Sequence, residues 1–158
     1  MQKITPFLWF NTNAEEALEF YAGIFKSFKV TSKSYWGKGG PGPEGTLMTA
    51  AFELEGQGFV ALNGGPVFTF TEAISFMINC ETPEEVDHYW DKLSSNGGTT
   101  SQCGWLKDKF GLSWQVVPTV LTKLAGNSDK KKVGSMMQAM MKMTKLDTKI
   151  LQDAFDNG

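Results

Sequence analysis

Residues 7–24, FLWFNTNAEEALEFYAGI, and residues 76–93, FMINCETPEEVDHYWDKL, show the same order of residue types 69 positions apart. Each begins with a short apolar, β-like run. Each continues into a segment whose apolar residues recur at i, i+3, i+4 and i+7, the spacing of one helical face. The pattern therefore predicts a strand followed by a helix, present twice. The helical stripes are Ala17, Phe20, Tyr21 and Ile24, and then Val86, Tyr89, Trp90 and Leu93.

The start of each predicted helix carries capping residues. Asn13 and Thr82 are N-cap types, whose side-chain oxygen can accept a hydrogen bond from a free N–H of the first turn. Glu16 and Glu85 follow three residues later and would complete a capping box. Pro83 suits the first helical position, where its missing N–H costs little.

Further β-like segments follow each helix, separated by turn sequences such as 56–58 and 108–111. The sequence predicts an α+β fold made of two βαβββ modules, residues 1–66 and 72–120, in a single domain. A helical extension over residues 128–157 would complete it. The predicted strands are 4–10, 29–36, 47–54 and 59–62, and then 74–79, 99–102, 105–107 and 112–117.

The composition is that of a folded protein, with 158 residues, 41% hydrophobic and 20% charged. The net charge of -2 and the single short basic run at 130–132 predict no nucleic-acid partner. The apolar run at 7–10 is too short for a signal peptide, and no stretch is long enough to span a membrane. Cys80 and Cys103 show no pairing pattern. We therefore expect reduced thiols, no membrane contact and a cytoplasmic location.

The last thirty residues contain a methionine-rich helical stripe. A sequence resembling a capping box, residues 144–147, then predicts a second helix. A stripe of this kind usually packs in a core or an interface, so dimer contact or cavity closure is the expected role. The Gly/Pro-rich segment 37–45 lacks the Lys-Ser/Thr of a phosphate-binding loop and is expected to be a mobile loop or lid. The stripe consists of Val133, Met136, Met137, Met140 and Met141, and the second helix has Leu146, Ile150, Leu151 and Ala154 on one face.

The chain resembles the vicinal oxygen chelate superfamily, which includes glyoxalase I, extradiol dioxygenases and bleomycin-resistance proteins. Within it, the chain looks most like the PhnB-like group. The motifs that carry the resemblance are Asn11-x-x-Ala14-Glu15-Glu16-Ala17-x-x-Phe20-Tyr21, Asp108-Lys109-Phe110-Gly111-x-Ser113-Trp114-Gln115 and Met143-x-Lys145-Leu146-Asp147. The resemblance implies an eight-stranded cup-like sheet with helices outside, and a homodimer.

The PhnB-like group is often labelled as a 3-demethylubiquinone-9 3-methyltransferase. Methyl transfer would require a site for S-adenosylmethionine, commonly a glycine turn after the first strand. Here that strand ends Phe10-Asn11-Thr12-Asn13, without glycine.

Metal-dependent members of the superfamily hold a metal with one ligand on each of four cup strands. By resemblance these positions fall on Pro6, on Ala61 or Leu62, on Ser75 and on Gln115. None is a histidine or a carboxylate, the ligands that a divalent metal prefers. The single histidine, His88, lies in the second predicted helix. The sequence therefore predicts no metal and no cofactor.

Strand alternation predicts the side chains that line the cup. Phe7 and Trp9 are expected to face the helix layer. For Asn79 and Ser113 a filled core is an equal alternative to a pocket. The predicted cup residues are Leu8, Phe10, Asn63, Ser75, Met77, Asn79, Ser113 and Gln115, with Trp36 and Trp105 at the mouth.

An apolar cavity with a few neutral polar groups is typical of a small-molecule site. The first hypothesis is a metal-independent binding protein for a small molecule, comparable to the bleomycin-resistance proteins. The second is an enzyme, either a lyase or isomerase of the superfamily type or the methyltransferase of the label. The third is an interaction module that works through the tail. No pair of residues has the spacing of a general acid and base, so catalytic residues stay unassigned.

Overall fold

The computed structural model describes residues 2–158, which divide into two compact units. The first unit ends at Phe70 and the second begins at Thr71. Each unit contains one four-stranded sheet, and the two sheets have equivalent strand orders, β1-β4-β3-β2 and β5-β8-β7-β6.

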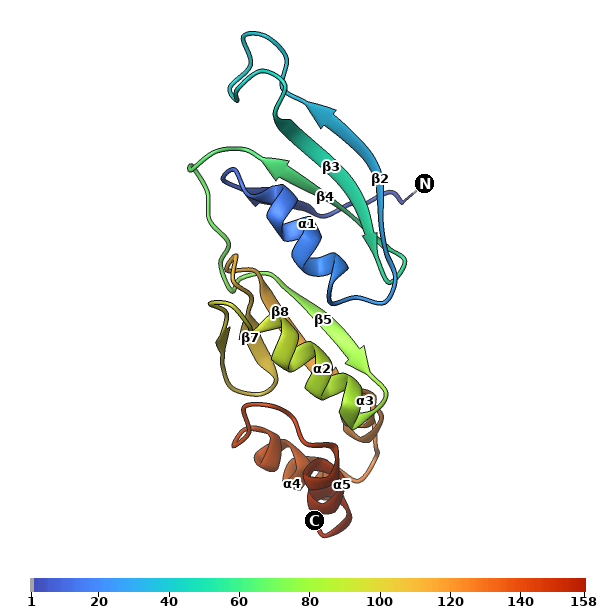
Figure 1. Ribbon diagram of the computed structural model, residues 1–158. Helices are drawn as coiled ribbons and strands as arrows, with labels where there is room; N and C mark the ends of the chain where they lie inside the picture. The colour runs from blue at the N-terminus through green and yellow to red at the C-terminus, as the bar shows by residue number, and fades with distance from the viewer. Residues whose placement is uncertain (1) are drawn as a thin grey trace. The chain divides into compact units, whose positions relative to one another are not determined.

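In the first unit, helix α1 covers one face of its sheet (Figure 1). Strand β1 pairs with β4 in parallel, and the other neighbours are antiparallel. Apolar side chains of the sheet and of α1 are buried between these two layers, as the amphipathic stripe predicts. The elements are β1 (Phe7–Phe10), α1 (Ala14–Ala22), β2 (Phe28–Tyr35), β3 (Leu47–Leu54) and β4 (Gln57–Asn63).

The second unit repeats this order and continues into the helical tail (Figure 1). The predicted α+β class, with two sheets and a helical extension, is confirmed. That both sheets join in one eight-stranded cup stays a prediction. The elements are β5 (Ser75–Cys80), α2 (Pro83–Leu93), β6 (Thr99–Thr100), β7 (Trp105–Lys107), β8 (Ser113–Pro118), α3 (Thr119–Ala125), α4 (Lys130–Met140) and α5 (Thr148–Asp156).

The two helices that follow the first strand of each unit are capped differently. In α2 the Glu85 N–H donates to the Thr82 hydroxyl at 3.2 Å, which is the predicted N-cap bond. The Glu85 carboxylate accepts from the N–H of Glu81, the residue before the N-cap, at 2.7 Å. In α1 the Asn13 side chain makes no cap hydrogen bond. The Ala14 N–H instead donates to the Asn63 amide oxygen at 2.9 Å. The prediction for Asn13 is wrong, because a residue at the end of β4 supplies the cap.

The tail forms its own apolar cluster against α3. Met136, Leu146, Leu151 and Phe155 are buried together, with Met140 and Met143 among the half-buried residues around them. Met137 and Met141 are exposed, at 38% and 67%. The methionine stripe therefore contributes a core on one side and exposed apolar surface on the other.

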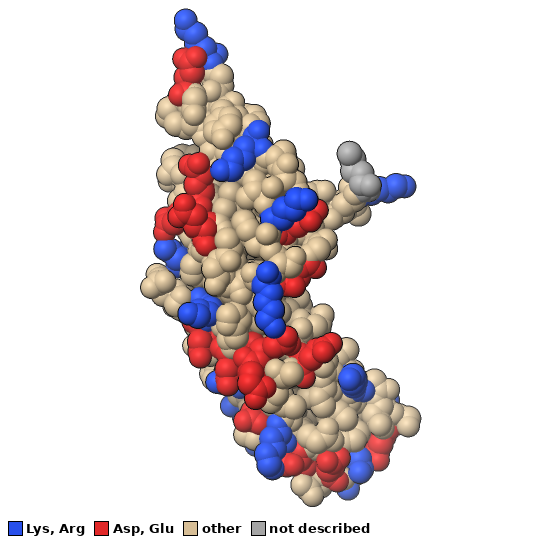
Figure 2. All heavy atoms as spheres, turned by 45° about the vertical axis from the view of Figure 1, so that its right-hand side comes forward, with Lys and Arg blue, Asp and Glu red and all other residues tan. Residues whose placement is uncertain are grey.

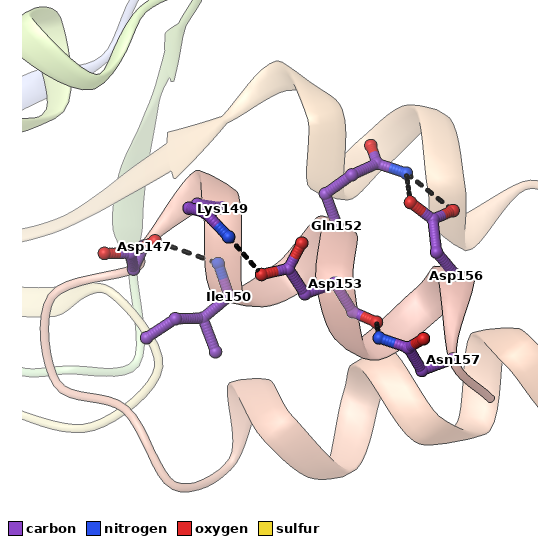
Figure 3. Close-up of polar contacts among 7 residues, drawn as sticks. All are labelled: Asp147, Lys149, Ile150, Gln152, Asp153, Asp156 and Asn157. Atoms are coloured by element: carbon purple, nitrogen blue, oxygen red, sulfur yellow. Dashed lines mark hydrogen bonds and ion pairs between the residues drawn. The ribbon is translucent and has the colours of Figure 1, made fainter.

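Helix α5 begins later than the sequence indicated. Its N-cap is Asp147, whose carboxylate accepts from the Ile150 N–H at 2.9 Å (Figure 3). The predicted capping box at 144–147 is therefore wrong. Thr144 lies in the loop before α5, where its carbonyl accepts a backbone hydrogen bond from the Gly104 N–H at 2.7 Å. Ion pairing between Lys149 and Asp153 follows on the exposed side of α5 (Figure 3).

A buried carboxylate organises the turn between β7 and β8. Asp108 is only 2% exposed. One of its oxygens accepts from the Phe110 and Leu112 N–H groups at 2.9 and 3.1 Å, and the other accepts from the Trp114 indole N–H at 2.9 Å. The Asp-Lys-Phe-Gly-x-x-Trp motif is therefore a structural turn that holds the start of β8 in place.

The two cysteines differ in exposure. Both are free; Cys80 is buried and Cys103 is half-buried. Burial, reinforced by the negative charge of Glu85, raises the pKa of the Cys80 thiol from 9.0 to about 12. Since the folded pKa lies above the unfolded one, the stability linked to Cys80 is complete below pH 9 and is lost as the pH rises toward 12.

We therefore expect iodoacetamide at pH 8 to modify Cys103 in the native protein and to leave Cys80 unmodified. Peptide mass spectrometry after timed quenching measures both sites. Modification of Cys80 at the same rate as Cys103 would contradict the burial of Cys80.

Within residues 2–158, none of the helices combines the length and the apolar character that crossing a bilayer requires. On the face of the molecule drawn in Figure 2, basic and acidic side chains are both exposed, with acidic ones gathered in a patch near the middle of the view, and the sequence as a whole has a net charge of -2.

Candidate functional site

The register of the second sheet aligns polar side chains in rows across its strands. Trp114 and Leu106 are paired and buried, and Trp114 contacts Phe76, so these residues mark the face that packs against α2. The alternate residues lie on the opposite face, which we call the open face of the second sheet. One row of this face consists of Thr99, Lys107, Ser113 and Ser75, and the next of Trp105, Gln115 and Met77.

The structure brings together the two residues predicted at the centre of the site. The Gln115 side-chain amide donates to the Ser75 hydroxyl at 2.8 Å. Met77, in the same row as Gln115, is 51% exposed, and Asn79 is exposed at the end of β5. The predicted orientation of Ser75, Met77 and Gln115, away from the helix, agrees with this register.

A cavity of about 530 Å³ opens at the row that contains Ser113. It is lined by Ser113 and Trp105, the register partners of Ser75 and Gln115, but not by Ser75 or Gln115 themselves. Ser113 is fully buried, and its hydroxyl oxygen has no hydrogen-bond partner. An unsatisfied buried hydroxyl costs about 1–3 kcal/mol, so native proteins retain few of them. The lining residues are Glu72, Thr99, Thr100, Ser101, Trp105, Leu106, Lys107 and Ser113.

One ion pair lies at this cavity. The Lys107 ammonium is 2.8 Å from the Glu72 carboxylate, and both side chains are well exposed, at 44% and 63%. The hydrogen bond from Lys107 lowers the pKa of the Glu72 carboxyl. Because exposed pairs contribute little to stability, this one can open at small cost.

The predicted face of β1 is wrong. Leu8 and Phe10 are buried, at 4% and 3%, on the same face as Ala61, which is Leu8's partner in the register. Phe7 is 62% exposed and lies on the opposite face. Leu8 and Phe10 therefore pack in the layer shared with α1 and do not line an open cup.

A single additional residue explains this error. In the second unit Cys80, the last buried residue of β5, precedes the N-cap Thr82 by two positions. In the first unit Phe10 precedes Asn13 by three. Aligning the helices therefore shifts the strands by one residue, and a one-residue shift moves every side chain to the other face.

The corrected register changes two of the expected metal-ligand positions. Phe7 pairs with Val60 as Met77 pairs with Gln115, so Val60 is the counterpart of Gln115. Thr5, in place of Pro6, is then the counterpart of Ser75. Among residues 2–158, no three histidine, cysteine or acidic side chains come together as a group that could hold a metal ion.

The open face of the first sheet is partly covered by the segment after β4. The Trp9 indole N–H donates to the Gly65 carbonyl at 2.9 Å, and the Trp9 and Phe68 rings meet edge to face at 5.0 Å. A Cβ on Gly64 would lie 2.4 Å from the Trp9 ring, so this close approach requires glycine. Because this segment covers part of the open face of the first sheet, the open face of the second sheet is the better candidate for a binding site.

Two other predicted site residues lie in the first unit, at a separate cavity of about 420 Å³. Asn63 lines it, but the Asn63 amide is engaged by Ala14 and by the Leu47 carbonyl at 3.2 Å. Trp36 closes the Gly/Pro-rich loop through backbone hydrogen bonds with Thr46 and Gly45, and its ring packs against Gly42. Both residues have structural roles, and that the loop acts as a lid stays a prediction.

Comparison with known proteins shows the family of this chain. Residues 2–117 match the family model described as 3-demethylubiquinone-9 3-methyltransferase. The chain belongs to this family. A PhnB protein from Bacillus cereus is 40% identical, with a TM-score of 0.67, and the match covers 74% of this chain and 99% of that chain.

More distant structures share the fold of this family member. A Pseudomonas aeruginosa protein, PA1353, is 21% identical with a TM-score of 0.61, covering 75% of this chain and 98% of that one. The Listeria monocytogenes fosfomycin resistance protein FosX, complexed with Mn(II) and sulfate, is 14% identical with a TM-score of 0.52, covering 75% and 91%. These two similarities show the vicinal oxygen chelate fold alone. A comparison with curated proteins found no match.

Proposed function

We propose that this family member binds a small molecule on the open face of its second sheet without a metal ion. The observation that carries the proposal is the buried, unpartnered hydroxyl of Ser113 at a cavity on the same face as the Ser75–Gln115 hydrogen bond. A ligand atom that bonds this hydroxyl removes the cost of its burial, which supports a binding role. Trp105 lines the same cavity, and Met77 and Asn79 lie on the same face of the sheet, farther along β5.

Binding or sequestration, as the resemblance to the bleomycin-resistance proteins implies, is the favoured form of the function. Neither Thr5 nor Val60 is a strong metal ligand, and no general acid and base pair is assigned. We also propose that the two modules form one domain and that the chain is a cytoplasmic homodimer. The exposed Met137 and Met141 support the dimer, which size-exclusion chromatography with light scattering tests.

A second candidate function follows from the family description, which is that of a methyltransferase. Isothermal calorimetry with S-adenosylmethionine tests it. Saturable binding at micromolar concentrations would favour methyl transfer over sequestration.

The binding proposal is tested by a thermal-shift screen of aromatic, quinone and glycopeptide ligands. A ligand at a hundred times its Kd adds about 2.7 kcal/mol, which raises the melting temperature by roughly 5–10 °C. We expect Gln115→Ala to lose most of this rise. Gln152→Ala is the matched control, because Gln152 lies on α5 and bonds Asp156. Equal responses in both variants, or silence across the whole screen, would count against the proposal.

A further inference from the structure

The cavity at Ser113 combines hydroxyl groups with a single cation. Lys107 is the register partner of Ser113 on one side and of Thr99 on the other, so the three side chains lie in adjacent positions of one row. Ser101 adds one more hydroxyl group to the lining. Lys107 offers three N–H donors and no acceptor, and the hydroxyl groups can also donate hydrogen bonds to a ligand group in the cavity.

Among residues 2–158, the only acidic group that lines this cavity is Glu72, and it already contacts the lysine. Glu72 precedes β5, is exposed, and its carboxylate lies 2.8 Å from the Lys107 ammonium. A carboxylate is itself an oxyanion. The position of the Glu72 carboxylate therefore shows where an oxyanion from a ligand would contact Lys107. Because the Glu72 side chain is exposed, it can move away from Lys107 at small cost.

We propose that this cavity binds the oxyanion of a small molecule, with Lys107 as the cationic anchor, Ser113 and Thr99 as hydroxyl donors, and Glu72 as an internal competitor. This inference rests on the proposed function and names its ligand class. The ligand oxyanion replaces the Glu72 carboxylate on Lys107 and bonds the hydroxyl of Ser113. Trp105 lines the same cavity and packs against the apolar part of the ligand.

Calorimetry at low ionic strength tests the inference with three probes. Phenyl phosphate and benzoate carry an oxyanion on an aromatic ring, and phenol is their neutral counterpart. We expect the two anions to bind and phenol to bind at least about tenfold more weakly, because charge-assisted hydrogen bonds are the stronger kind. The stronger of the two anions identifies phosphate or carboxylate as the preferred group.

Three variants separate the roles. Lys107→Gln is expected to weaken binding of the anions about tenfold or more, and Glu72→Gln to tighten it roughly threefold to fivefold because the competitor is neutralised. Lys149→Gln is the matched control, since it removes another exposed ion pair, with Asp153, on α5. It should leave the Kd unchanged. Ser113→Ala is expected to weaken binding without lowering the melting temperature, because the hydroxyl makes no hydrogen bond to another group of the protein.

Unchanged affinity in Lys107→Gln, or weaker affinity in Glu72→Gln, would overturn the inference. The second result would indicate that the Glu72 carboxylate positions Lys107 for the anion and does not compete with it. If screened ligands act through Gln115 while phenyl phosphate and benzoate do not bind, the oxyanion inference fails and the proposed function stands. If no ligand acts through Gln115, the proposed function itself fails.

Discussion

Replacing Asp108 by alanine is expected to lower the free energy of unfolding by about 3–5 kcal/mol, because three hydrogen-bond donors lose a buried, charged acceptor. Two of them are backbone N–H groups of the turn and the third is the Trp114 indole. At 2% exposure, little water can replace the carboxylate. Urea denaturation followed by tryptophan fluorescence measures the change.

The matched control is Asp153→Ala, which removes an exposed carboxylate paired with Lys149. Such a pair contributes at most about 1 kcal/mol. Asp108→Asn keeps the shape and part of the acceptor capacity, so its loss should lie between the two. A loss below about 1 kcal/mol in Asp108→Ala would show that the Asp108 turn does not hold the start of β8.

Met136→Ala is the second substitution with a large expected effect, a loss of about 2–4 kcal/mol from a cavity in the tail cluster. Met136 is fully buried, whereas Met141, the matched control, is 67% exposed. Met141→Ala should change the stability of the monomer by less than about 0.5 kcal/mol. Hydrogen exchange over α4 and α5 reports on the tail separately from the sheet.

Equal effects of the two methionine substitutions would contradict the packing of the tail cluster. A change of oligomeric state in Met141→Ala alone would instead indicate that the exposed side of the stripe forms the dimer contact. The two readouts therefore separate the core role of Met136 from an interface role of Met141.

The sequence predicted those features that depend on local spacing. The helix stripes at 17–24 and 86–93, the Thr82 cap and the turn at Asp108 all follow from residues a few positions apart. The orientation of β5 and β8 was also predictable, because the two strands alternate without interruption. The resemblance implies that Ser75 and Gln115 face the cup, and the alternation then predicts the face of the other residues of β5 and β8; the Ser75–Gln115 hydrogen bond agrees with this common face.

Features that depend on partners far apart in the sequence, or on a difference of one residue between the two units, were not predictable. Asn63 caps α1 from 49 positions away, and nothing near Asn13 indicates this. The additional residue between Phe10 and Asn13 moves the side chains of β1 to the faces opposite to those predicted, although the helices of the two units align well. The Lys107–Glu72 pair was also missed, because Glu72 lies outside every strand and helix. The feature of the sequence that could have indicated a cation at the site was the position of Lys107 on β7, in the same row as Ser113.

We propose that the open face of the second sheet is the ligand site. Backbone amide NMR during titration with phenyl phosphate, or with the strongest ligand of the thermal-shift screen, locates the bound ligand on the protein. We expect saturable shift changes at Ser75, Ser113 and Gln115, with little change at Asn63 and in α5. Changes confined to the cavity around Trp36 and Asn63, or to the tail, would contradict it.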